Sequence, residues 1–241
     1  MHLTGTIINV ATILLGGFFG LLLGNRLPEK VRYTIMMALG LFTFAYGIRL
    51  FMQTGNSLVV LISMLIGVLL GEWWRIEDAL SHLGVFLERK FNRNKGIESA
   101  KFIRGFLSAS LLFSIGPMAI LGSIQDGLTG DYNTLVIKAI MDGFAAIAFA
   151  SSLGIGVLFS SLVILVYQGG LSLLATQLQF IMSDQVLAEF SAIGGIMLMG
   201  IAVSSLLEVK KIRVANFLPG FIILPLVIWI FNFFGIYVSS Q

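Results

Sequence analysis

Residues 4–24 of the chain read TGTIINVATILLGGFFGLLLG and contain no charged side chain. A transmembrane α-helix needs about 20 apolar residues to cross the hydrocarbon core of a bilayer. No lysine or arginine precedes this stretch, and its length is that of a span that stays in the membrane rather than of a cleaved signal peptide. The stretch therefore predicts a first membrane-spanning helix.

The rest of the chain has the same character. Of its 241 residues, 57% are hydrophobic and 11% are charged, and the mean hydropathy is +0.97. Soluble domains carry about 25% charged residues, so a water-soluble fold of this size would lack the polar surface to cover itself. We expect an all-α membrane protein with a single transmembrane domain, residues 1–241, and eight apolar segments. These segments are Thr4–Gly24, Tyr33–Met52, Ser57–Trp74, Ile103–Ser123, Thr134–Ser151, Ile155–Phe180, Val186–Leu207 and Val214–Val238.

The distribution of charge orients these segments. Basic residues gather after the first, third and seventh segments: Arg26, Lys30, Arg32, Arg75, Arg89, Lys90, Arg93, Lys95, Lys101, Arg104, Lys210, Lys211 and Arg213. Acidic residues occupy the loops opposite, namely Asp126, Asp131 and Asp184. Basic loops are typical of the cytoplasmic side, so we expect both termini outside the bacterial cytoplasmic membrane.

The hardest division lies in residues 134–180, which are nearly continuous apolar sequence and too long for one span. The only credible break is Ser151-Ser152-Leu153-Gly154. Without it, the basic loops after the third and seventh segments would fall on opposite sides of the membrane. The charge rule therefore supports the break independently.

A segment at about 75–94 differs from the apolar spans. Its residues Ile76, Leu80, Leu83 and Leu87 recur at helical spacing, with charged residues on the other faces. This pattern predicts an amphipathic helix that lies on the cytoplasmic membrane surface. Such a helix serves either as a membrane anchor or as a docking site for a partner.

An internal similarity relates the two ends of the chain. The pair Gly16-Gly17 resembles Gly169-Gly170, Gly40 aligns with Gly195 at a shift of 155 residues, and Gly67 aligns with Gly220 at a shift of 153. Segments one to three thus correspond to segments six to eight. Matching segments are an odd number of spans apart and run in opposite directions, which predicts an inverted-topology repeat of the kind found in secondary transporters.

A second similarity joins the middle of the chain. Residues 114–123 read SIGPMAILGS, and residues 152–161 read SLGIGVLFSS. Each begins with serine, an aliphatic residue and glycine, followed by a residue that weakens a helix; Pro117 has no N–H group to donate. Freed backbone groups in lipid need partners. Either these breaks belong to discontinuous helices or re-entrant hairpins that form a binding site, or they are a proline kink and a tight turn.

Charged residues inside the apolar segments indicate where a site lies. Lys138 and Asp142 are four residues apart and share a helix face, so they can pair. Each costs roughly 3 kcal/mol to insert, which indicates an ion-binding, proton-relay or substrate role, or a structural tie to neighbouring helices. Asn9 can join this site or an interhelical hydrogen bond, and Asp126 can equally lie in water. The candidate solute- or ion-binding residues are Ser114, Gly116, Pro117, Asp126, Lys138, Asp142, Ser151, Ser152 and Gly154.

Several function classes find no support in the sequence. The chain has no cysteine and two histidines, and it lacks HExxH, Walker A, GxGxxG and intramembrane-protease GxGD patterns. We therefore expect no enzyme, no catalytic residue and no cofactor, and the sequence leaves a metal site open. The net charge of +3 is confined to particular loops, which argues against nucleic acid as a partner. Two glycine ladders indicate close helix packing, within the chain or in a homodimer; they are Gly16, Gly20 and Gly24, and Gly67 and Gly71.

Three stretches carry a resemblance to a known family. Residues 114–131 read SIGPMAILGSIQDGLTGD, residues 138–144 read KAIMDGF, and residues 149–157 read FASSLGIGV. Together they resemble the YdfK/YqgA-like bacterial membrane proteins, known as domain of unknown function 554, over nearly the whole chain. The resemblance implies the bacterial cytoplasmic membrane and brings no settled substrate.

The expected function therefore rests on the residues themselves. They favour a secondary transporter of a small solute or ion, with a site near mid-membrane at the helix breaks. The alternatives are a passive channel lined by the same breaks, or a non-transporting membrane protein that binds a partner through its amphipathic helix.

Overall fold

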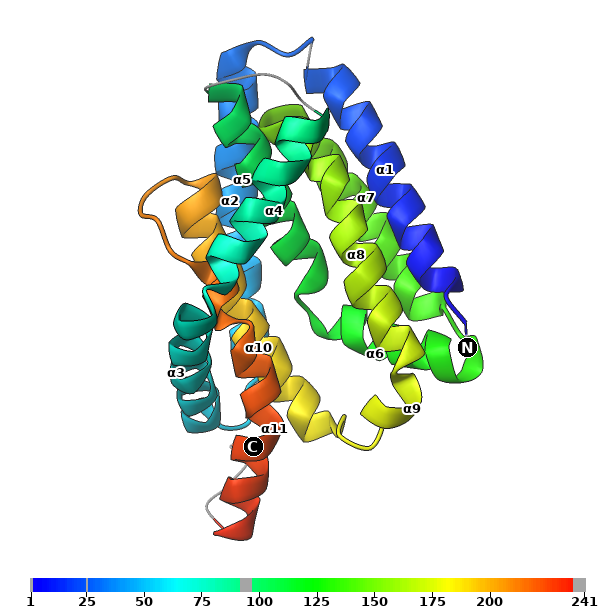
Figure 1. The fold of residues 1–241 in the computed structure, drawn as a ribbon, viewed down its shortest axis with the longest axis vertical. Helices are drawn as coiled ribbons and strands as arrows, with labels where there is room; N and C mark the ends of the chain where they lie inside the picture. The colour runs from blue at the N-terminus through cyan, green and yellow to red at the C-terminus, as the bar shows by residue number, and fades with distance from the viewer. Residues whose placement is uncertain (1, 25, 92–96, 236–241) are drawn as a thin grey trace.

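A computed structural model describes residues 2–24, 26–91 and 97–235, and within these ranges the chain is helical and contains no strand (Figure 1). Seven helical segments of the described chain are long and apolar enough to cross a membrane. They are α1 (Thr4–Gly24), α2 (Glu29–Phe51), α3 (Ser57–Trp74), α7 (Asn133–Leu153), α8 (Gly156–Leu173), α10 (Asp184–Ile201) with its π-helical continuation η1 (Ala202–Leu206), and α11 (Pro219–Phe233) with the preceding 3₁₀ turn η2 (Val214–Phe217). The expected all-α membrane fold is confirmed.

The expected fourth segment is divided into two helices. α5 (Ile97–Ser114) and α6 (Pro117–Thr129) together have the composition of an eighth span, and their axes differ by 62°. Gly116, between them, has φ = 131°, a backbone conformation that residues with a Cβ rarely adopt. Pro117 suits the first position of a helix. The break at Gly116 is therefore confirmed. The expectation that the segment ends at Ser123 is wrong, because α6 continues to Thr129.

The second break is a turn between two separate helices. α7 ends at Leu153, Gly154 has φ = 79°, and α8 begins at Gly156. The Ser152 hydroxyl donates a hydrogen bond to the Arg32 carbonyl oxygen (3.3 Å), which places this turn beside the start of α2. The division of residues 134–180 is thus confirmed. α8 ends at Leu173, short of the expected Phe180, and the four-residue helix α9 (Ala175–Leu178) follows.

Both glycine ladders pack helices of the same chain. A Cβ at Gly16 would lie 2.2 Å from the carbonyl oxygen of Gly143, and one at Gly20 would lie 2.3 Å from that of Ile147, so α1 lies against the backbone of α7. A Cβ at Gly71 would lie 2.0 Å from the carbonyl oxygen of Asn216. The ladders therefore bring α1 to α7 and α3 to η2 and α11, as small residues do in membrane bundles.

The amphipathic segment forms α4 (Ile76–Phe91), which lies across α5 in Figure 1. Leu87 packs with Phe102 and Phe106 in a small apolar cluster between α4 and α5. At its start, the Glu77 N–H donates to Asn216 Oδ1 (2.7 Å), and the Ala215 N–H donates to Glu77 Oε2 (2.9 Å). These two bonds fix the start of α4 to η2. Residues 92–94 of the expected amphipathic helix, Arg93 and Lys95 of the basic loop, and residues 236–238 of the expected eighth segment lie outside the described residues.

Glu77 gives α4 a pH-dependent attachment. Burial raises the pKa of Glu77, against smaller lowering effects of the Ala215 N–H, Lys211 and Arg213. Because the pKa is higher in the folded than in the unfolded protein, the folded protein binds this proton more tightly. The resulting stability is fully present below the unfolded pKa and is lost as the pH rises through the folded pKa.

We expect Glu77→Gln to raise the melting temperature at about pH 8, because it removes a partly buried charge and keeps an acceptor for the Ala215 N–H. The variant should also flatten the change in melting temperature between about pH 5 and about pH 8. Glu77→Ala should be about 1 kcal/mol less stable than Glu77→Gln at either pH, because the Ala215 N–H loses its acceptor. Thermal melts of the purified protein across pH measure both effects. A Gln variant that melts below wild type at the higher pH would show that attraction to Lys211 and Arg213 outweighs burial.

Candidate functional site

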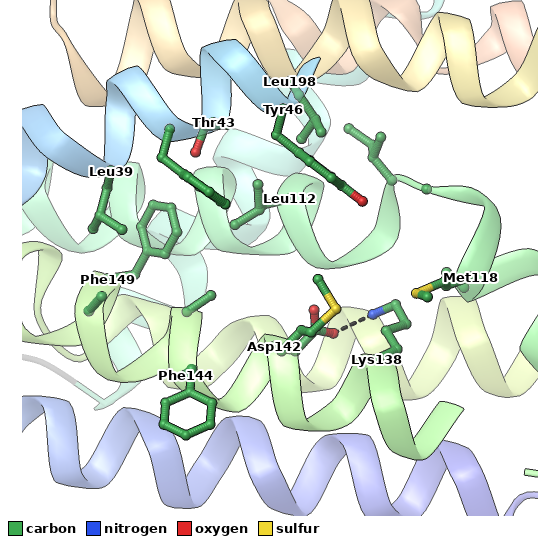
Figure 2. A pocket seen from close by; sticks show the side chains of 17 residues that line it. Leu39, Thr43, Tyr46, Leu112, Met118, Lys138, Asp142, Phe144, Phe149 and Leu198 are labelled. Atoms are coloured by element: carbon green, nitrogen blue, oxygen red, sulfur yellow. Dashed lines mark hydrogen bonds and ion pairs between the residues drawn. The ribbon is translucent and has the colours of Figure 1, made fainter. Parts of the chain in front are cut away.

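A cavity of about 460 Å³ lies between α2, the α5–α6 break, α7 and α10 (Figure 2). Its volume lies within the range of small-molecule sites, about 300–1,000 Å³. The lining side chains are mostly apolar. The lining residues are Leu39, Phe42, Thr43, Tyr46, Leu112, Ile115, Gly116, Met118, Ala119, Lys138, Met141, Asp142, Phe144, Ala145, Ala148, Phe149 and Leu198.

An ion pair forms part of the cavity wall. Lys138 and Asp142 lie one turn apart on α7, and the Lys138 ammonium contacts Asp142 Oδ2. Their side chains are 7% and 13% exposed, so both charges are largely removed from solvent. The sequence predicts this pairing, because residues four apart share a helix face.

Polar side chains of α1 and α8 form a hydrogen-bond network that includes Asp142. The Asn9 side-chain amide donates to Asp142 Oδ2 (3.0 Å) and to Gln168 Oε1 (2.9 Å). Gln168 in turn donates to the Thr6 hydroxyl (3.3 Å), and Thr6, Asn9 and Gln168 are fully buried. Sequence reasoning included Asn9 and missed Thr6 and Gln168. An amide inside the apolar run 155–173 is the signal that points to Gln168.

Asp126 lies in the interior of the described structure, not in water. Its side chain is buried, and Oδ2 accepts a hydrogen bond from the Gly5 N–H (2.9 Å) in the first turn of α1. A carboxylate at this position stabilises the positive end of the helix. The other oxygen, Oδ1, has no hydrogen-bond partner among the described residues. Asp126 does not line the cavity, so its geometry is that of a cap that joins α6 to α1.

The remaining candidates fall in two places. Gly116 lines the cavity with Lys138 and Asp142, and Pro117 begins α6 immediately beside it. Ser114 is buried nearby on α5 and does not line the cavity. The structure thus brings the first break to the ion pair.

The second break lies far from the ion pair. Ser151 and Ser152 lie in the last turn of α7, and Gly154 follows that helix. They come nine or more residues after Asp142, which is about 14 Å or more at 1.5 Å per residue. Within the described chain, these three residues are absent from the cavity lining. They connect α7 to α8 beside Arg32 instead.

The site therefore offers a solute both apolar surface and charge. Tyr46 and Thr43 add hydroxyl groups from α2, which the sequence did not single out. A hydroxyl in an apolar helix is too common to mark a site without knowledge of what faces it.

Comparison with known proteins places the chain in a family. Residues 4–229 match the family described as "Protein of unknown function (DUF554)". The chain is 31% identical over 220 residues to "Uncharacterized protein YqgA" of Escherichia coli (strain K12). This alignment covers 91% of the chain and 93% of YqgA. The chain is also 30% identical over 238 residues to "Uncharacterized membrane protein YdfK" of Bacillus subtilis (strain 168). That alignment covers 96% of the chain and 98% of YdfK. No solved structure matches this chain. With its apolar helices and these relatives, the chain is a multi-pass membrane protein and belongs to the DUF554 family.

Proposed function

We propose that this protein is a secondary transporter of a small solute across the bacterial cytoplasmic membrane, and that the cavity is its binding site. The observation that carries the proposal is the buried Lys138–Asp142 pair in the wall of a solute-sized cavity, beside the helix interruption at Gly116. Charges within a membrane are costly and usually serve function. Interrupted helices supply the binding sites of many transporters.

An inverted repeat supports alternating access. The repeat in the sequence equates α1 with α8, α2 with α10 and α3 with α11. A two-fold axis that exchanges two neighbouring helices brings equivalent residues near the axis into contact. Gly67 and Gly220 are equivalent at the shift of 153, and a Cβ at Gly67 would lie 2.3 Å from the Gly220 nitrogen.

The α2–α10 pair is also in close backbone contact, at two glycines that the repeat does not equate. A Cβ at Gly47 would lie 2.6 Å from the Gly195 carbonyl oxygen, and a Cβ at Gly195 would lie 2.4 Å from that of Gly47. The two halves of such a repeat can rock against each other around a fixed central site, which opens the site to each side of the membrane in turn.

The proposal includes an orientation, with basic connections in the cytoplasm and both termini outside. The chain has no native cysteine, so single cysteines report cleanly. In spheroplasts, a membrane-impermeant maleimide should label Tyr132→Cys, in the α6–α7 connection, and should label Lys210→Cys only after permeabilisation. Both positions are exposed in the structure. Labelling of Lys210→Cys in intact spheroplasts would reverse the orientation.

Transport is tested with vesicles that contain the purified protein and a small-molecule extract of the expression host. Mass spectrometry identifies compounds that leave wild-type vesicles and remain in empty ones. Asp142→Asn should slow that loss by about tenfold or more, because it removes the charge that Lys138 and Asn9 hold at the cavity. The control is Asp131→Asn, at an exposed acid in the α6–α7 connection, which should transport as wild type does.

Two measurements complete this test. The melting curve of Asp142→Asn must show that the variant is folded at the assay temperature for the loss to be functional. Counterflow of the identified compound, driven by unlabelled compound on the opposite side, separates a transporter from a passive pore, which shows none. Equal loss from wild-type and Asp142→Asn vesicles would contradict the proposed site.

A further inference from the structure

The cavity is charged at one end and mostly apolar at the other. In Figure 2 the Lys138 ammonium, the Tyr46 hydroxyl and Met118 lie at one end, and Leu39 and Phe149 lie at the other. The polar end also contains Gly116, where α6 begins. The shape of the site therefore matches a solute with one polar end and one apolar end.

The polar end lies toward the first residue of α7, and the apolar end extends past the middle of this helix toward its last residue. Lys138 is about 8 Å along α7 from its first residue, Asn133, at 1.5 Å per residue, and Phe149 is about 16 Å further along. An amphipathic molecule in the leaflet next to Asn133 has its head and tail in the same order along α7, with the head at the nearer surface and the tail directed into the bilayer. It fits the cavity without turning over.

Exposed apolar side chains form one side of the cavity. Phe42, Met141 and Phe144 line it and are 69%, 51% and 70% exposed. Phe42 is near the middle of α2 and Phe144 is near the middle of α7, so neither lies at a water-facing end of its helix. A solute dissolved in the bilayer can therefore reach the cavity between α2 and α7.

The groups at the polar end favour an anion. The Asp142 carboxylate already accepts hydrogen bonds from Lys138 and Asn9. Lys138 has three N–H donors, Tyr46 adds a hydroxyl, and α6 directs its positive N-terminal end toward the cavity at Gly116 and Ala119. A second cation here would lie beside an ammonium and a helix N-terminus, whereas a carboxylate would find several donors.

We propose that the cavity binds an amphipathic carboxylic acid that enters from the bilayer, with its carboxylate at Lys138 and its hydrocarbon tail between Leu39 and Phe149. This inference names the substrate class of the proposed transporter. Movement of the acid across the membrane rests on the proposed function, whereas binding of the acid does not.

The binding test uses decanoic acid with a photoreactive diazirine at the end of its chain and the protein in lipid nanodiscs. Label should concentrate on the α2 and α7 peptides that contain Leu39 and Phe149. Unlabelled decanoate should reduce this label by about tenfold, while decyltrimethylammonium, decanol and acetate should not. Decyltrimethylammonium reverses the charge of the head, decanol removes that charge, and acetate lacks the tail.

Two variants test the two ends of the cavity separately. The pair variant Lys138→Ala/Asp142→Asn removes both charges together and should reduce the label by about tenfold. Ala148→Trp fills the apolar end and should exclude decanoate while the ion pair remains intact. Lys210→Ala, at an exposed basic residue outside the cavity, should label as wild type does.

Several outcomes would overturn the inference. Equal competition by decyltrimethylammonium would refute the anionic head, and label spread evenly over lipid-facing helices would refute a defined site. A disulfide between two copies of Phe42→Cys at high yield would show that a second chain covers the opening. Decanoate that binds in the cavity without counterflow would uphold the inference and refute transport. Transport of an unrelated solute from the extract-filled vesicles, without decanoate binding, would uphold transport and refute this inference.

Discussion

Lys138→Ala is expected to cost about 3–5 kcal/mol of stability and to abolish transport, because it leaves the Asp142 carboxylate buried without its counter-charge. Among the described residues, the Asn9 amide is then the remaining donor to Asp142. The pair variant Lys138→Ala/Asp142→Asn should recover most of that stability, since a neutral amide at 142 needs no counter-charge. Transport should stay lost in the pair variant, because the solute then meets no charge in the cavity.

Melting temperatures of the two single variants and the pair variant give the coupling between the side chains directly. Lys210→Ala removes an exposed positive charge and controls for the change in net charge. If the losses in the two single variants simply add in the pair variant, the two side chains do not stabilise each other. If activity returns whenever stability returns, the pair is structural and the cavity does not use its charge.

The membrane spans were predictable because the bilayer imposes a length on each apolar run. The run at residues 4–24 coincides with α1, and the run at residues 57–74 coincides with α3. The break at Gly154 also followed from sequence, since the basic loops agree in orientation only if α7 and α8 are separate. Helix ends at polar residues were less predictable. Asp126 resembled a loop residue because nothing local reveals that the Gly5 N–H lies opposite it.

The candidate site was predictable only where its geometry is local. Lys138 and Asp142 lie on one helix, and helical spacing alone brings them together. Asn9, Gln168 and Tyr46 come from three other helices, and their approach depends on the packing of the whole bundle. No spacing rule along the chain carries that information.

The similarity of the two serine–glycine breaks was misleading for the same reason. A local motif specifies a loose backbone but not its depth in the membrane. A Cβ at Gly156 would lie 2.1 Å from the Phe102 carbonyl oxygen, near the start of α5, whereas Gly116 follows the end of that helix. The two breaks are therefore separated along α5 by about 18 Å, at 1.5 Å for each residue from Phe102 to Ser114. Only the break at Gly116 reaches the cavity.

The close approach of α1 to α7 predicts a large effect of one methyl group. Gly16→Ala should cost about 3 kcal/mol, because the new Cβ would lie 2.2 Å from the Gly143 carbonyl oxygen, where backbone and not a flexible side chain must move. α1 also carries Asn9, whose amide reaches Asp142 across the same interface, so the shift should weaken transport as well.

Gly170→Ala is the matched control, because a Cβ there meets no atom of the described residues within 4 Å. Gly170 lies within α8, and alanine loses less backbone freedom on folding than glycine, so this variant should gain about 0.5–1 kcal/mol. The two variants make the same chemical change and should shift the melting temperature in opposite directions. A gain for both would mean that α1 and α7 are not in backbone contact, and Asn9 would then have no fixed path to Asp142.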